Sequence, residues 1–149
     1  MLVSSFMIPA NKVVTCSADA TIEKVMTQVL EKKISAVVVV DAAKKPCGIV
    51  TKTDFVSAYH KGVDLHQSVS LIMNTKLDTV LDTDDKDKAA KLFEKQRHHH
   101  AIVVNKSYEF VGLISAWDIA AECARDSRAW PWTRTEDGRI HQPAHQRSR

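Results

Sequence analysis

The chain has 149 residues, of which 44% are hydrophobic and 26% are charged, a composition typical of globular domains and not of disordered chains. Its longest purely apolar run, residues 36–40, is too short to cross a bilayer, and its first residues show no signal-peptide pattern. The net charge of +3 equals the excess of six arginines over three acidic residues after residue 124, so the rest of the chain is close to neutral.

Cysteine usage bears on the compartment. The chain has three cysteines, Cys16, Cys47 and Cys123, which are odd in number, widely spaced and without a CxxC pair. This pattern favours a reducing compartment over a disulfide framework. We therefore expect a cytoplasmic protein that has no contact with a membrane.

The first half of the chain predicts a β-α-β-β-α unit. Residues 12–16 predict a short strand, residues 20–33 a helix, residues 35–40 a strand buried on both sides, and residues 48–50 a further strand. Thr51 then opens a second helix. One apolar face of the first helix is predicted from residues at i, i+3, i+4, i+7 and i+8, namely Ile22, Val25, Met26, Val29 and Leu30.

The second half repeats the first. GIVTKTDF begins at Gly48 and GLISAWDI at Gly112, 64 residues later, with the same classes of residue in the same order. The same spacing aligns KVVT at 12–15 with KLDT at 76–79, and it predicts a helix over 86–96. Upstream, a V-S-x-x-M lead occurs at 3–7 and again at 69–73, a spacing of 66. Repetition at this period indicates two copies of one supersecondary unit.

These patterns predict an α/β fold of tandem β-α-β-β-α repeats with pseudo-twofold symmetry, because a repeat this short cannot cover its own sheet. We place the first repeat at residues 1–62, the second at 63–125 and a flexible C-terminal tail at 126–149. The basic residues change type near the last boundary: the lysines stop at Lys106, whereas six of the seven arginines lie at or after Arg125.

Two interpretations apply to T-K-T-D at 51–54 and S-A-W-D at 115–118. In the structural one, the hydroxyl and the carboxylate form a capping box at a helix N-terminus. In the functional one, the same N-terminus attracts a phosphate, while the carboxylate accepts hydrogen bonds from two sugar hydroxyls. We favour the functional interpretation, because the repeat would bring two such helix starts together in one cleft.

The doubled motif Gly-h-h-Thr/Ser-x-x-Asp-h, where h is hydrophobic, resembles that of the CBS-domain pair, or Bateman module. The resemblance extends over residues 3–125 and includes Met-Ile-Pro at 7–9 and Val-Val-Asp at 39–41. It implies a regulatory sensor of adenosyl ligands, such as AMP, ADP, ATP or S-adenosylmethionine, and not an enzyme.

The resemblance also implies roles for individual residues. Asp54 and Asp118 would bind ribose hydroxyls, and Thr51 and Ser115 would face ribose or phosphate. Lys52 would line the phosphate path. Adenine would contact the start of each buried strand, which includes Ile34, Ala36, His98 and His100.

The two sites are expected to be unequal. At the spacing of 64, Ala116 takes the place of Lys52 and Trp117 takes the place of Thr53. Trp117 would either crowd the second cleft or stack on a base. We therefore expect the Asp54 site to be the principal one.

The run His98-His99-His100 does not predict a metal site. Consecutive strand residues alternate faces, so three neighbours cannot converge on one ion. His100 is instead expected to line the ligand cleft. Since no Ser-His-Asp arrangement and no glycine-rich phosphate loop occur, we expect neither catalysis nor a cofactor, and magnesium only in company with ATP.

The tail contains a mixture of basic and aromatic side chains, Arg128, Trp130, Trp132 and Arg134, that can stack on nucleic-acid bases. A charge of +3 on one short tail is small for a nucleic-acid interface, and a loose end or a contact with a protein is favoured.

The function predicted from the sequence is that of a CBS pair that homodimerises through its helices, binds an adenosyl nucleotide and signals to an effector protein. The alternative is a ligand-free dimerisation or assembly module in which both motifs are helix caps only.

Overall fold

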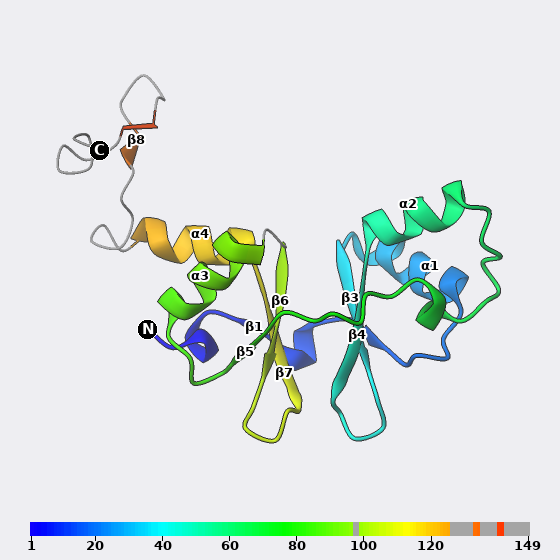
Figure 1. Cartoon of the computed structure of the whole chain (residues 1–149), viewed down its shortest axis with the longest axis horizontal. Coiled ribbons are helices and arrows are strands. Elements are labelled where there is room, and N and C mark those ends of the chain that lie inside the picture. Colours follow the sequence, from blue (N-terminus) through cyan, green and yellow to red (C-terminus); the bar gives the residue numbers. More distant parts are fainter. Residues whose placement is uncertain (97–98, 126–132, 135–139, 142–149) are drawn as a thin grey trace.

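Two β-sheets stand side by side in the middle of the molecule, and each carries two helices on its outer side (Figure 1). The structure is a computed structural model and describes residues 1–96, 99–125, 133–134 and 140–141. The predicted α/β class and the order β-α-β-β-α, twice, are confirmed. None of the described helices is both long enough and apolar enough to span a membrane.

The first repeat follows an N-terminal lead. The lead consists of η1 (Val3–Ser5), β1 (Ile8–Pro9) and η2 (Ala10–Lys12). The repeat itself consists of β2 (Thr15–Cys16), α1 (Ile22–Lys32), β3 (Ala36–Val40), β4 (Pro46–Thr51) and α2 (Lys52–His60). The predicted strand at 12–16 is therefore shorter than expected, because Lys12 ends the 3-10 turn η2 and the strand begins only at Thr15.

The second repeat has the same elements. They are η3 (Val69–Leu71), β5 (Thr79–Leu81), α3 (Lys86–Gln96), β6 (His100–Val104), β7 (Phe110–Ser115) and α4 (Ala116–Arg125). In both repeats the first strand pairs parallel to the second, and the second pairs antiparallel to the third. Even the register shifts coincide, between Val39 and Val40 and between Val103 and Val104. In the tail, β8 (Thr133–Arg134) pairs with β9 (Ile140–His141).

Each lead packs on the other repeat. β1 extends the second sheet as a neighbour of β7, and Val3 is fully buried among the core residues of the second repeat. In the same way, Asn74 pairs with Ile49 of β4, and Val69 is fully buried in the core of the first repeat. The N-terminus accordingly lies beside α3 and α4 (Figure 1). This exchange ties the two repeats together.

Two glycines permit the exchange. A Cβ atom on Gly48 would lie 2.5 Å from Sδ of Met73, and one on Gly112 would lie 2.5 Å from Sδ of Met7. The Gly112 position is the more constrained, because its Cβ would also lie 2.8 Å from the backbone oxygen of Ile8. The glycine of one repeat and the methionine of the other repeat's lead are thus one packing unit.

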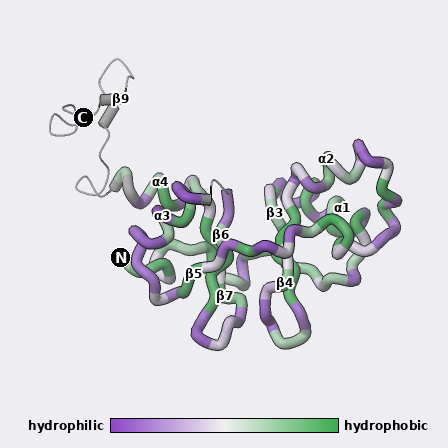
Figure 2. The backbone as a smooth tube through the Cα atoms, viewed as in Figure 1, coloured by the Kyte–Doolittle hydropathy of each residue, from purple (hydrophilic) through white to green (hydrophobic). Residues whose placement is uncertain are grey.

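A third apolar cluster joins the two sheets and consists of Val38, Ile102, Val104 and Leu113. Hydropathy follows this arrangement, with hydrophobic strands in the middle and hydrophilic hairpin tips (Figure 2). The predicted face of α1 is buried at Ile22, Val25 and Val29, but Leu30 is 71% exposed, so its inward placement was wrong. Leu30 lies about 100° round the helix from Val29, beyond the edge of the buried face.

Candidate ligand-binding site

Two cavities lie between the repeats, and the larger of these two has a volume of about 490 Å³. Its lining residues come from the first motif, from the second lead and from the starts of β3 and β6. They are Ser35, Ile49, Thr51, Lys52, Thr53, Asp54, Asn74, Lys76, Asp78, His99 and His100. The predicted residues Thr51, Lys52, Asp54 and His100 therefore meet in one cavity, and His98 lies outside the described residues.

Asp54 closes a capping box at the start of α2. Its Oδ2 accepts hydrogen bonds from the Thr51 backbone N–H at 2.8 Å and from the Thr51 hydroxyl at 3.1 Å. Among the described residues, no hydrogen bond reaches Oδ1. The capping interpretation is thus confirmed, yet one carboxylate oxygen in the cavity lining keeps its full accepting capacity.

The second motif has the same geometry at the start of α4. Oδ2 of Asp118 accepts from the Ser115 backbone N–H and from the Ser115 hydroxyl, both at 2.8 Å. The Ser115 hydroxyl in turn accepts from the Asp118 backbone N–H at 3.1 Å. The sequence repeat at spacing 64 therefore extends to individual hydrogen bonds.

The backbone donors at the two helix starts are largely engaged. The Lys52 N–H donates to the Ser35 carbonyl at 3.2 Å, and the Ala116 N–H donates to the His99 carbonyl at 2.8 Å. With the capping-box bonds added, few N–H groups remain for an anion. Positive charge in the larger cavity comes instead from side chains, namely Lys52 and Lys76.

Sequence reasoning missed the part of the larger cavity that the second lead supplies. Asn74, Lys76 and Asp78 line it because Asn74 pairs with Ile49 beside the first motif, with N···O distances of 2.9 and 3.0 Å. The signal was the V-S-x-x-M lead. Its presence in both copies marks it as part of the repeated unit. That each lead packs on the other repeat is a tertiary property, which the repeat does not reveal.

A smaller cavity of about 300 Å³ is the counterpart of the larger one. Its lining combines the second motif with the first lead and the start of β3: Ile8, Val13, Lys33, Ile34, Ser35, Ala36, Lys52, His100, Leu113 and Ser115. Leu113 and Ser115 correspond to Ile49 and Thr51 at spacing 64. The predicted residues Ile34, Ala36 and Ser115 therefore line this cavity and not the one that contains Asp54.

Trp117 and Asp118 line neither cavity. The Trp117 side chain is 79% exposed and does not line the smaller cavity, so it does not crowd that cavity. Asp118 lies close enough to His100 for its charge to raise the pKa of that imidazole.

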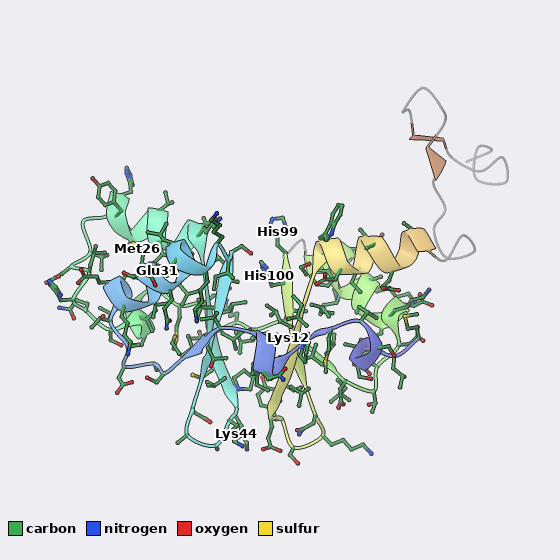
Figure 3. The ribbon with its side chains drawn as sticks, turned by 180° about the vertical axis from the view of Figure 1, so that it is seen from behind. Lys12, Met26, Glu31, Lys44, His99 and His100 are labelled. Atoms are coloured by element: carbon green, nitrogen blue, oxygen red, sulfur yellow. The ribbon has the colours of Figure 1, made fainter. Side chains whose placement is uncertain are left out.

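His100 lies between the two repeats, next to His99 (Figure 3). Its Nε2 is 3.3 Å from the Ser35 hydroxyl, which belongs to the other repeat. Burial, and then the neighbouring His99, lower the pKa of His100 below its ordinary 6.5, against the opposing effect of Asp118. The lowered pKa favours the neutral ring, which shares a hydrogen bond with Ser35. Within the described part of the chain, no three His, Cys, Asp or Glu side chains are grouped closely enough to hold a metal ion.

Comparison with known proteins shows the class of the molecule. Residues 3–61 and 69–125 each match the CBS domain. The chain therefore belongs to the CBS-domain family and contains a pair of these domains, as the sequence resemblance predicted. No curated protein matches it at a significant level.

Solved structures of CBS-domain proteins have the same fold. PAE2072 from Pyrobaculum aerophilum, complexed with AMP, is 29% identical over 84% of this chain and 99% of that one, with a TM-score of 0.73. CBSX2 in complex with AMP is 17% identical over 85% and 98%, with a TM-score of 0.76. The CBS-domain pair of MJ0100, in complex with 5'-methylthioadenosine and S-adenosylmethionine, is 20% identical over 85% and 98%, with a TM-score of 0.74.

Proposed function

We propose that this protein is a non-catalytic regulatory module that binds an adenosyl nucleotide in the larger cavity and signals its presence to an effector protein. The observation that carries the proposal is the Asp54 carboxylate. It lines a cavity between the repeats and keeps Oδ1 available, while Oδ2 caps α2. A carboxylate so placed can accept hydrogen bonds from ribose hydroxyls.

The other lining residues suit the rest of a nucleotide. Lys52 and Lys76 provide positive charge for a phosphate, and Thr53 adds a hydroxyl beside them. His99, His100 and Ile49 offer ring and apolar surface for a base. Magnesium would enter only as the counter-ion of ATP.

The related structures support this proposal. PAE2072, which shares both the fold and 29% of the sequence, is complexed with AMP. CBSX2 and MJ0100 share the fold, and they are complexed with AMP and with 5'-methylthioadenosine and S-adenosylmethionine, respectively. An adenosine group is common to all of these ligands.

A thermal-shift panel tests the proposal, with AMP, ADP, ATP and S-adenosylmethionine, each with and without magnesium. A ligand at a hundredfold excess over its Kd adds about 2.7 kcal/mol to the free energy of unfolding. For a domain of this size that corresponds to a rise in Tm of roughly 5–10 °C. A rise of this order with at least one compound is expected. Flat curves with all of them would contradict the proposal.

The exposed apolar side chains of α2 and α4 favour homodimerisation as part of the function. Val56 and Tyr59 on α2 are 68% and 82% exposed, and Trp117 on α4 is also exposed. Both helices lie along the same edge of the molecule (Figure 1). We propose that a second copy covers this edge, in a cytoplasmic dimer.

The alternative function is that of a ligand-free assembly module. Such a module would dimerise through the same edge but would bind no nucleotide in the larger cavity. Light scattering on the wild type and on Tyr59→Ser, combined with the ligand panel, separates the two. A dimer that Tyr59→Ser dissociates, together with flat ligand curves, would favour the assembly module.

A further inference from the structure

The smaller cavity differs from the larger one in the chemistry of its lining. Five of its ten described lining residues are aliphatic: Ile8, Val13, Ile34, Ala36 and Leu113. In the larger cavity, Ile49 is the one aliphatic residue among the eleven that the structure places in the lining. Asp54 and Asp78 line the larger cavity, whereas no described carboxylate lines the smaller one. The equivalence of the two motifs therefore does not extend to the two cavities.

The smaller cavity lacks the group that would hold a ribose. Asp54 lines the larger cavity, but its counterpart Asp118 lines neither, although its charge acts on His100. The Ser115 hydroxyl, which does line the smaller cavity, already donates to Asp118 Oδ2 at 2.8 Å and accepts from the Asp118 N–H at 3.1 Å. The described lining thus offers no carboxylate to accept hydrogen bonds from a pair of sugar hydroxyls.

The polar part of the smaller cavity is cationic. Lys33 and Lys52 line it, and neither forms an ion pair with another described residue. Lys33 lines this cavity alone, so a cation remains there even when Lys52 contacts a ligand in the larger cavity. The Ser35 hydroxyl and His100 Nε2, which are 3.3 Å apart, add groups that can hydrogen-bond to a ligand. Such a set of side chains suits an anion.

The backbone at Lys33 favours glycine over lysine. Lys33 ends α1 with a φ of 53°, in the left-handed region, which glycine adopts without strain and other residues adopt at a cost. Non-glycine residues in this region are frequent at ligand-binding sites. The side chain that lysine brings to this position supplies a cation to the smaller cavity.

We propose that the smaller cavity binds a small organic anion, that is, a carboxylate or phosphate group on an aliphatic or aromatic body, and not a nucleotide. Lys33 and Lys52 hold the anionic group, and the aliphatic side chains cover the body. The volume of about 300 Å³ lies at the lower end of the range for ligand pockets, which suits a ligand smaller than a nucleotide. The protein then binds two chemically different ligands in neighbouring cavities.

Methyl NMR on the full chain tests the proposal, with the isoleucine signals assigned from Ile8→Val, Ile34→Val and Ile49→Val. Ile8 and Ile34 report on the smaller cavity and Ile49 on the larger one. The probes are phenyl phosphate, 4-methylpentanoate, inorganic phosphate, 4-methylpentan-1-ol and AMP.

The two organic anions should shift the Ile8 and Ile34 signals saturably and leave Ile49 unchanged. Inorganic phosphate has no carbon body for the aliphatic side chains to cover, and the alcohol has no charge for the lysines to hold. Each should therefore bind at least about tenfold more weakly than the organic anions.

Matched lysine variants show which cavity holds the anion. Lys33→Met removes a cation that lines only the smaller cavity, and Lys76→Met removes one that lines only the larger cavity. Lys33→Met should weaken organic-anion binding about two- to fivefold, the range of an exposed ion pair, and Lys76→Met should leave it unchanged. Lys33→Gly should weaken it likewise. Its Tm should equal or exceed that of the wild type, because glycine relieves the backbone strain, so unfolding would not explain the loss.

The outcomes separate the organic-anion site from the proposed nucleotide site. Unshifted Ile8 and Ile34 signals with both organic anions at up to about 10 mM, or equal affinity in the wild type and both Lys33 variants, would overturn the proposal. A second AMP binding step, seen at Ile8 and Ile34, would also overturn it, because the smaller cavity would then be a nucleotide site. The proposed function stands if AMP shifts the Ile49 signal, and it fails if AMP shifts no signal, whatever the organic anions do.

Discussion

At the scale of single residues, the pairs Gly48–Met73 and Gly112–Met7 explain why the motif begins with glycine. From the sequence, this glycine was only the first letter of a repeated pattern. In the structure, each glycine leaves room for a methionine of the other repeat's lead. The glycine motif recurs at spacing 64 and the V-S-x-x-M lead at spacing 66. The motif of each repeat therefore contacts the lead of the other.

The two glycines should respond differently to substitution. Gly112→Ala places Cβ 2.8 Å from the Ile8 backbone oxygen, which cannot rotate away, whereas the three atoms nearest to a Cβ on Gly48 all belong to the flexible Met73 side chain. We expect Gly112→Ala to lower the free energy of unfolding by about 1–3 kcal/mol and Gly48→Ala by less. Urea denaturation of both variants measures the difference. A larger loss for Gly48→Ala would contradict this packing.

His100 should make stability depend on pH. Burial lowers its pKa below 6.5, so the unfolded chain binds a proton more readily than the folded chain at pH values just under 6.5. The stability that depends on the neutral ring is fully present above pH 6.5 and is lost as the pH falls through the lowered pKa. In the fold, His99, Asp118 and the Ser35 hydroxyl act on this ring.

The measurement is Tm against pH for the wild type and for His100→Gln. The wild type should lose more stability than the variant on going from pH 7 to pH 5. His60→Gln, at an exposed position on α2, is the matched control and should follow the wild type. If His100→Gln and the wild type had the same pH profile, the ring would not be the titrating group.

At the scale of elements, local patterns predicted the strands and helices well. The buried strands at β3 and β6, the start of α2 after Thr51 and the bounds of α3 all agree with the pattern. The errors arose where tertiary contacts decide. Leu30 has the spacing of a core residue but lies beyond the packed face. The first strand begins only at Thr15, as β5 begins at its counterpart Thr79, and Lys12 belongs to the 3-10 turn η2.

The exchanged leads predict a crossed effect of core substitutions. Val3 precedes the first repeat in sequence but is fully buried in the core of the second, with Val103 and Ile114. Val3→Ala should therefore raise amide hydrogen exchange in β6 and β7 more than in β3 and β4, because it leaves a cavity in the second core. Val69→Ala, its counterpart, should show the opposite distribution. Faster amide hydrogen exchange confined to the repeat that follows each lead in sequence would contradict the packing of each lead on the other repeat.

At the scale of the whole molecule, the sequence identified candidate site residues but did not predict how they are distributed between the cavities. The repeat implied that two such helix starts face one cleft. Because the leads cross over, each motif meets the strand start and the lead of the other repeat. Asp54 is therefore grouped with Lys76 and His100, and Ser115 with Ile34 and Ala36. Such long-range contacts leave no periodic signal in the sequence.

The most direct test of nucleotide binding in the larger cavity is a calorimetric titration with AMP of the wild type, Asp54→Ala and Asp118→Ala. Asp54→Ala removes the cap of α2 and Asp118→Ala removes the equivalent cap of α4, but only Asp54 lines the larger cavity. Loss of a hydrogen-bonded charged group costs about 1.5–3 kcal/mol. We therefore predict that Asp54→Ala weakens the first equivalent of AMP at least about tenfold and that Asp118→Ala barely changes it. An unchanged first equivalent in folded Asp54→Ala, or an equal loss in both variants, would contradict the account.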